Sequence, residues 1–330
     1  MAKSARAIWL CLLAGCGSDA TSAGGDTDRR ALLSIVGLPA LAATDGRYEV
    51  WSVGADGGAT RMGVAAAFPA TGVELSLPAG ASRVLVTWEP PNDQDAAPSR
   101  FTLLHGARRG ASVDLTVTGA LTLDGVEVQR APGQFTMFSP SDNAERGYPS
   151  FEESGVWLFN MTPRTLPQND MWVRLAQLQP GWVYEGWMVR DIDQVGAIWL
   201  SYGKFTPDAT GAVNRRDDTG WGAFSGVRDF LTAGEEEFPG DDWISNPLGY
   251  PLPAGLSLPL NLREKDARGV GRWTHVITIE PASDRGEAIT TERPFVLRPY
   301  RDAFGDGGPG IPRTITLRAD GVPSGRLVLP

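Results

Sequence analysis

Cysteine is scarce in this 330-residue chain, and its placement limits what the chain can do. The two cysteines, Cys11 and Cys16, both lie within the first sixteen residues. No cysteine is therefore available downstream for a disulfide, a thiolate metal site or a cysteine nucleophile. We expect the folded part to be held together by burial of its core.

Long apolar runs and an excess of positive charge are also lacking. No run approaches the eighteen apolar residues typical of a transmembrane helix. Lysine and arginine total 30 against 39 aspartate and glutamate residues, a net charge of −9. This balance argues against nucleic acid as a partner and against electrostatic adhesion to anionic lipid.

Recognisable catalytic motifs are missing as well. The chain has two histidines and contains no Gly-x-Ser-x-Gly, His-Glu-x-x-His, Walker or dinucleotide-binding pattern. We therefore predict a non-enzymatic protein with no cofactor and no metal site, and a hydrolase with an unrecognised site is the least favoured alternative.

The first sixteen residues have the pattern of a bacterial lipoprotein signal. Two basic residues precede an apolar run over 7–13, and Leu-Ala-Gly then leads directly to Cys16. We predict removal of 1–15, acylation of Cys16 and a flexible linker over 16–28; an ordinary signal peptide is the alternative. The mature chain then has 28 basic against 39 acidic residues, a net charge of −11.

These features predict a protein tethered by lipid on the outer side of a bacterial membrane. Gly17, and not an aspartate, follows the lipidated cysteine. This weakly favours the outer over the inner membrane in a host that has both.

Composition and periodicity predict an all-β chain. Forty glycines and 25 prolines are too many for a helical protein. Apolar residues alternate with period two in short runs separated by turn formers such as Asp-Gly, for example over 113–117 and 314–317. We expect two tandem antiparallel β-sandwich units, with additional strands over Gln134–Phe138 and Gly155–Phe159.

The two units are predicted from four sequence blocks that recur in the same order. They are Tyr48–Val53 with Tyr184–Val189, Gly63–Phe68 with Gly203–Phe205, Val86–Pro90 with Ile277–Pro281, and Phe101–Leu104 with Phe295–Arg298. We place unit one at 29–118 and unit two at 119–330.

The blocks of unit one resemble a known family. Leu38-Pro39, the Tyr-Glu-Val-Trp block, Val-Thr-Trp-Glu-Pro and Leu-Leu-His-Gly at 103–106 are similar to the extracytoplasmic domain of anti-sigma-K factors. The resemblance implies a β-sandwich, and unit two shares it more loosely.

Other features of that family are missing. Anti-sigma factors of this type also have a membrane helix and a cytoplasmic His-x₃-Cys-x₂-Cys domain, and neither pattern occurs here. We therefore expect no direct contact with a sigma factor.

Several polar or aromatic residues occur in both units, and we interpret them as structural. Glu89 and Glu280 are expected to accept backbone N–H bonds at strand ends, and Trp51 and Trp187 to be buried between sheets. Glu49 and Glu185 are the other shared acids, for which catalysis is the disfavoured interpretation. His275, on an apolar strand face, is predicted to be a hydrogen-bonded core residue.

The main difference between the units is a long insertion at about 207–273 in unit two. It contains aromatic and acidic residues, and loops on a rigid sandwich often bind ligands. The candidate binding residues are Trp221, Trp243, Glu235, Asp241 and Asp242. The aromatic rings could stack on the face of a sugar, and the carboxylates could bind Ca²⁺. The alternative, which we favour, is a structural cover whose aromatics pack onto the sheet.

The sequence thus predicts a surface-anchored lipoprotein that binds or scaffolds a protein or another envelope component. A glycan-binding or adhesion module is the principal alternative.

Overall fold

The computed structural model confirms the all-β prediction. It describes residues 28–117, 133–139, 152–158, 173, 175–176, 178, 181–207, 240–244, 252–281, 294–318 and 321–330. Antiparallel strands make up most of their regular structure, with short 3₁₀ turns at η1 (Ala43–Asp45) and η3 (Glu152–Ser154). No helix in these ranges is long and apolar enough to cross a membrane.

An eight-stranded antiparallel sheet contains the strands of unit one. Its order is β3-β2-β5-β6-β7-β16-β1-β4. The strands are β1 (Arg29–Val36), β2 (Arg47–Gly54), β3 (Ala59–Ala65), β4 (Val73–Leu77), β5 (Ala81–Glu89), β6 (Thr102–Arg109), β7 (Ser112–Val117) and β16 (Ser324–Val328).

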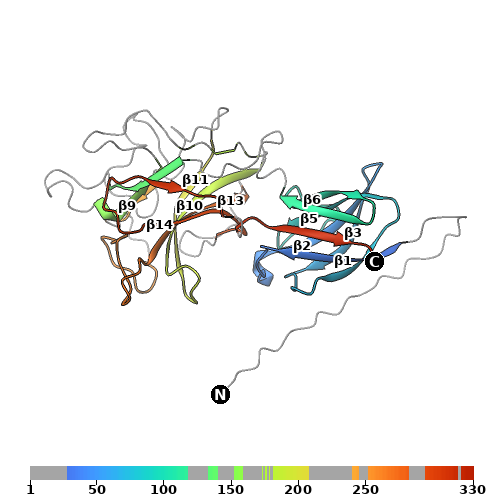
Figure 1. Cartoon of the computed structure of the whole chain (residues 1–330), viewed down its shortest axis with the longest axis horizontal. Helices are drawn as coiled ribbons and strands as arrows, with labels where there is room; N and C mark the ends of the chain where they lie inside the picture. The colour runs from blue at the N-terminus through green and yellow to red at the C-terminus, as the bar shows by residue number, and fades with distance from the viewer. Residues whose placement is uncertain are drawn as a thin grey trace, which may run out of the picture.

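The C-terminal strand β16 requires a correction to the predicted domain boundary. The sequence placed all of 119–330 in unit two. In the structure, β16 lies between β1 and β7, where Leu327 is paired with Leu33 on one side and Val113 on the other. Figure 1 shows this red C-terminal strand among the blue and green strands of unit one. The chain therefore returns to its first sheet at the end.

Two four-stranded sheets contain the strands of unit two. One has the order β11-β10-β13-β14 and the other the order β12-β9-β8-β15. The strands are β8 (Gly133–Met137), β9 (Gly155–Trp157), β10 (Trp182–Arg190), β11 (Ile198–Phe205), β12 (Gly240–Asp242), β13 (Trp273–Pro281), β14 (Leu297–Ala303) and β15 (Arg313–Ile315). The ring of Phe135 in β8 packs against that of His275 in β13, with centroids 4.2 Å apart, so the two sheets face each other as in a sandwich.

The internal repeat appears as one strand order used twice. β3-β2-β5-β6 in the first sheet corresponds to β11-β10-β13-β14 in the second. The register matches too, because Glu49 is opposite Thr87 and Glu185 is opposite Thr278. Both copies have a β-bulge just before the tryptophan of the β2 or β10 strand. The four matched blocks therefore lie in or beside four equivalent strands. The fourth match is out of register by two residues, because Val86 is opposite Leu104 and the equivalent Ile277 is opposite Tyr300.

One continuous hydrophobic core contains side chains from both strand sets. Four aromatic rings contact one another where the sets meet. Trp88 and Phe101 come from the first set, and Trp182 and Phe295 from the second. The neighbouring rings have centroids 5.2–5.8 Å apart, within the range of favourable aromatic contacts.

Candidate functional site

The structure does not support the predicted binding role for the described part of the insertion. Trp243 has no exposed surface and belongs to the main core. Asp241 and Asp242 lie in β12 and are 3% and 1% exposed. The expectation that these three side chains face a ligand is therefore wrong. Trp221 and Glu235, the other two candidates, lie outside the described residues.

The residues shared by the two units form the same hydrogen-bond series twice. Trp51 Nε1 donates to Thr87 Oγ1 at 3.0 Å, and the Thr87 hydroxyl donates to Glu89. In unit two, Trp187 Nε1 donates to Thr278 Oγ1 at 2.9 Å, and that hydroxyl donates to Glu280 Oε1 at 2.6 Å.

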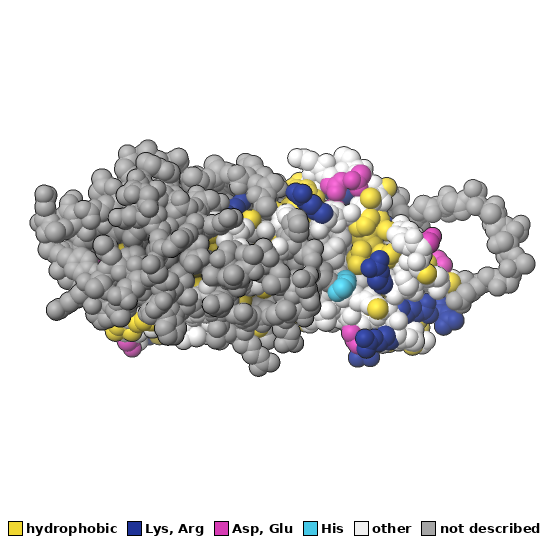
Figure 2. Space-filling view, turned by 90° about the horizontal axis from the view of Figure 1, so that it is seen from above, with side chains coloured by type: hydrophobic (Ala, Val, Ile, Leu, Met, Phe, Trp, Pro, Cys, Tyr) yellow, Lys and Arg dark blue, Asp and Glu magenta, His cyan; other side chains and the backbone are white. Residues whose placement is uncertain are grey.

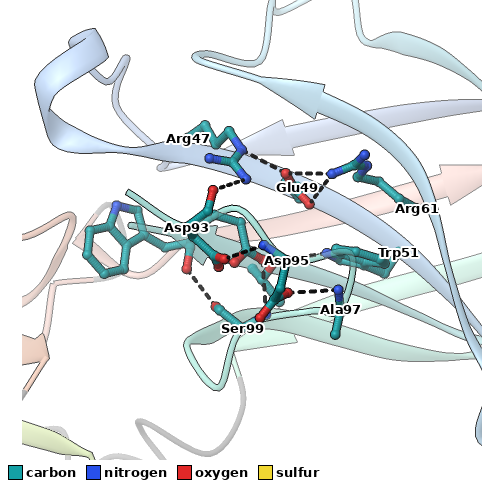
Figure 3. A network of polar contacts seen from close by, with 11 residues as sticks. Arg47, Glu49, Trp51, Arg61, Asp93, Asp95, Ala97 and Ser99 are labelled. Carbon is teal, nitrogen blue, oxygen red and sulfur yellow. Dashed lines mark hydrogen bonds and ion pairs between the residues drawn. The ribbon is translucent and has the colours of Figure 1, made fainter. Parts of the chain in front are cut away.

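In each unit, the glutamate of this hydrogen-bond series also accepts a hydrogen bond from a backbone N–H, as the sequence predicted. Ser99 N donates to Glu89 Oε1 at 3.1 Å, and Phe295 N donates to Glu280 Oε1 at 2.6 Å. Figure 3 shows the copy in unit one, where Glu49 also binds Arg47 at 2.7 Å and Arg61 at 3.2 Å. Burial raises the pKa of Glu89. These contacts indicate a structural role for Glu89 and Glu280, which bind the backbone after their strands, and for Glu49, which pairs with two arginines on the sheet surface.

The two shared tryptophans are buried, at 1% exposure each, but they lie on a different side of the sheet from that predicted. Tyr48 and Val50 of β2 point into the main core, so strand alternation turns Trp51 to the opposite face. Trp187 packs with Val189 and Val276 in a separate cluster. The opposite face is therefore covered as well, and in unit two it leads to the cleft described below.

His275 is a buried, hydrogen-bonded residue, which confirms its predicted structural role. Its Nε2 is 2.8 Å from the Tyr202 hydroxyl oxygen, and its ring packs against Phe135 at a tilt of 32°. Burial lowers the pKa of His275 to about 3, because the charged imidazolium would lose its hydration. Gly186, opposite Ile277 in the ladder, leaves the space that the Tyr202 ring fills: a Cβ there would come within 1.6 Å of the ring.

The site that sequence reasoning missed is a cleft of about 650 Å³. Residues 37–39, which follow β1, line one part of it, and the turn between β10 and β11 lines another. Trp199, Val276 and Val296 supply apolar surface, and three arginines, Arg298, Arg301 and Arg318, supply positive charge. The described lining thus combines cationic and apolar side chains from both parts of the chain.

A β-bulge places Arg298 in this cleft. Ile277 pairs with Tyr300 and Ile279 pairs with Leu297, so two residues of β14, Arg298 and Pro299, lie opposite one residue of β13. Bulges of this kind redirect a side chain. The Arg298 guanidinium carbon lies 4.8 Å from the centre of the Trp199 ring, and its Nε donates to Phe295 O at 3.1 Å. Burial lowers the pKa of Arg298, although arginine remains charged at neutral pH.

The other two arginines are held differently. Arg301 forms an ion pair with Asp193 at the β10–β11 turn, with a second contact at 3.1 Å. Asp193 has φ of 74°, a left-handed conformation that fits a tight turn. Arg318 is exposed, and its Nε donates to the Arg301 carbonyl at 3.0 Å. Arg301 thus joins the turn to β14, and Arg318 extends the basic surface.

One signal in the sequence could have pointed to this cleft. By strand register, the counterpart of Arg298 in unit one is Thr102, since Thr102 lies opposite Thr87 and the equivalent Thr278 lies opposite the Arg298–Pro299 bulge. A charge in place of an uncharged residue in an otherwise repeated strand indicates a function specific to one copy.

Comparison of the chain with protein-family models, curated proteins and solved structures gave no match. The resemblance of unit one to the extracytoplasmic domain of anti-sigma-K factors therefore stays a prediction.

Proposed function

We propose that this chain is a non-enzymatic binding protein of the bacterial cell envelope, tethered by lipid on Cys16, whose ligand occupies the cleft beside Trp199. The observation that carries the proposal is the cleft itself. Its volume of about 650 Å³ falls within the roughly 300–1,000 Å³ of typical small-molecule sites. A few polar groups on an otherwise apolar lining are also typical of such sites.

The walls of the cleft are fixed by neighbouring elements, which favours a preformed site. Val276 lies in the central strand β13, which is paired on both sides by β10 and β14. The ring of Trp199 meets Trp187 edge-on at 5.9 Å, and Trp187 is buried. Little side-chain entropy would be lost when a ligand binds against surfaces that are already ordered.

The proposed anchor is tested separately from the cleft. Protein extracted from membranes should have an intact mass that corresponds to an acylated chain beginning at Cys16. A Cys16→Ser variant should lose the lipid mass and leave the membrane fraction. Continued processing and membrane retention of this variant would overturn the lipid-anchor proposal and leave the binding proposal standing.

Binding at the cleft is tested by a thermal-shift screen of the mature chain, with Cys16 replaced by serine, against a chemically diverse small-molecule library. Compounds that stabilise the chain should lose affinity at least tenfold in a Trp199→Ala variant. They should keep their affinity in Arg268→Gln, because Arg268 is an exposed residue outside the cleft that is paired with Asp266. If no compound depends on Trp199, the cleft is not the binding site.

A further inference from the structure

The cleft gathers charge of the sign opposite to that of the whole protein. Its described lining carries three guanidinium groups and one carboxylate, that of Asp193, which gives a local charge of +2. The complete chain has a net charge of −9. On the described surface shown in Figure 2, basic and acidic side chains are interspersed. A local excess of arginine in an acidic protein favours an anionic ligand at that place.

Arg298 is the residue best placed to bind such a ligand. It is only partly exposed, and among the described residues no carboxylate forms an ion pair with it. Its Nε is occupied by the Phe295 carbonyl, so the two Nη groups are left to act as the fork that suits an oxyanion. The carboxylates of Glu280 and Asp193 stabilise the charge of Arg298 electrostatically without a direct ion pair, and burial still lowers its pKa. The cost of burying this cation is therefore only partly compensated, and a bound anion would offset more of it.

The remainder of the lining indicates what the anion is attached to. The Trp199 ring lies beneath the Arg298 guanidinium, and the side chains of Ile192, Val276 and Val296 also line the cleft. Trp199 and Ile192 are partly exposed and offer a flat or apolar contact surface near the arginine, whereas Val276 and Val296, at 1% and 6% exposure, lie at the base of the cleft. A small inorganic anion would leave that surface unfilled.

From this arrangement we infer that the cleft recognises an oxyanion, a carboxylate or a phosphate, borne on an aromatic or apolar body. The inference rests on the proposed binding function and specifies its ligand class. The oxyanion binds Arg298, with Arg301 and Arg318 adding positive potential, and the body packs on Trp199. The binding step is noncovalent, so no group is transferred.

The inference is tested with matched probes by isothermal titration calorimetry on the mature chain with Cys16 replaced by serine. The acids are 2-naphthoate and 2-naphthyl phosphate, and the neutral control is 2-naphthamide. We expect at least tenfold tighter binding of one or both acids than of the amide, and weaker binding at higher salt. The acid that binds more tightly identifies a carboxylate or a phosphate as the preferred group. Inorganic phosphate and acetate, tested alone, should bind at least tenfold more weakly than the matching naphthyl acid.

Variants locate the interaction. Arg298→Gln should weaken binding of the preferred acid at least tenfold and leave the affinity for 2-naphthamide nearly unchanged. Trp199→Ala should weaken binding of both the acid and the amide. Arg268→Gln is the control, since it removes an exposed, ion-paired arginine outside the cleft. Circular dichroism and thermal melting establish that each variant is folded.

Three outcomes would overturn the inference: equal affinity for acid and amide, acid binding that Arg298→Gln does not change, or no saturable binding of either acid. Neutral compounds whose binding depends on Trp199 in the library screen would then still support the proposed function. If the library screen also finds no compound that depends on Trp199, the proposed function fails together with the ligand class.

Discussion

At the scale of single residues, His275 shows how burial sets the chemistry of a side chain. It is 1% exposed, lies between Phe135 and Tyr202, and forms its hydrogen bond with the Tyr202 hydroxyl. Its pKa is lowered to about 3 from an ordinary value near 6.5. The neutral ring is therefore part of the folded state at physiological pH.

This lowered pKa predicts a specific loss of stability in acid. The unfolded chain binds a proton at His275 below about pH 6.5, whereas the folded chain resists protonation until about pH 3. The free energy of unfolding should therefore fall as the pH is lowered through this window. The contribution of His275 alone is about 3 kcal/mol at pH 4. Urea denaturation at pH 7, 5 and 4 should show a steeper decline for the wild type than for His275→Gln.

The second histidine of the chain provides an internal control. His105 lies on β6 and is largely exposed. Partial burial of its ring and the nearby charge of Arg83 lower its pKa. In a ¹H–¹⁵N NMR titration toward acid, the ring signals of His105 should move well before those of His275, which should stay nearly constant to pH 4. Titration of His275 near pH 6 would contradict the assignment of a neutral, buried ring.

At the scale of elements, β16 joins the end of the chain to its beginning. It pairs with β1 on one side and β7 on the other. Without it, both of these strands would lose a hydrogen-bonded neighbour and the eight-stranded sheet would be interrupted. Leu327 is fully buried, whereas the neighbouring Arg326 is exposed and only loosely paired with Asp114. The two residues thus report on opposite faces of one strand.

This placement predicts contrasting effects of two adjacent substitutions. Leu327→Ala should lower the free energy of unfolding by about 2–5 kcal/mol, because it leaves a cavity in the core. Arg326→Ala should change it by less than about 0.5 kcal/mol, because the exposed ion pair contributes little. Guanidinium denaturation of both variants measures the difference. Equal, small effects would mean that the C-terminal strand is not integrated into the sheet.

At the scale of the whole molecule, an aromatic cluster joins the two strand sets. Trp88, Phe101, Trp182 and Phe295 contact one another in a closed ring at the junction. The hydrophobic core is continuous across it. We therefore expect the two sets to stabilise each other instead of unfolding independently.

The coupling can be measured by a double-mutant cycle. Phe101→Ala and Trp182→Ala should show an interaction free energy of about 0.5–1.5 kcal/mol, because their rings contact edge to face at 5.3 Å. Phe101→Ala combined with Phe304→Ala is the control, since Phe304 packs on Phe135 elsewhere in the core. That pair should be additive to within about 0.5 kcal/mol. Additivity of the first pair would show that the two strand sets are energetically independent.

The sequence by itself determined the strands and the local repeat. Period two and turn residues are local signals, so they predicted strands such as β7, β8 and β9. In each unit, the first and third matched blocks together contain the tryptophan, threonine and glutamate of one hydrogen-bond series. Thr87 and Glu89 are two positions apart on one strand face, as are Thr278 and Glu280. The predicted roles of Glu89 and Glu280 came from their positions at strand ends in both units, and that of His275 from its apolar strand face.

Only the tertiary structure decided which faces are covered and which distant segments meet. Period two groups residues by face, but it does not say which face meets a second layer when both are buried, as at Trp187. The pairing of β16 with β1 joins the two ends of the chain, and no local pattern specifies such a contact. The cleft brings together Asp193, Trp199, Arg298 and Arg318 from separate segments. The bulge at Arg298 depends on pairing with β13, so the position of its charge is set by the assembled sheet.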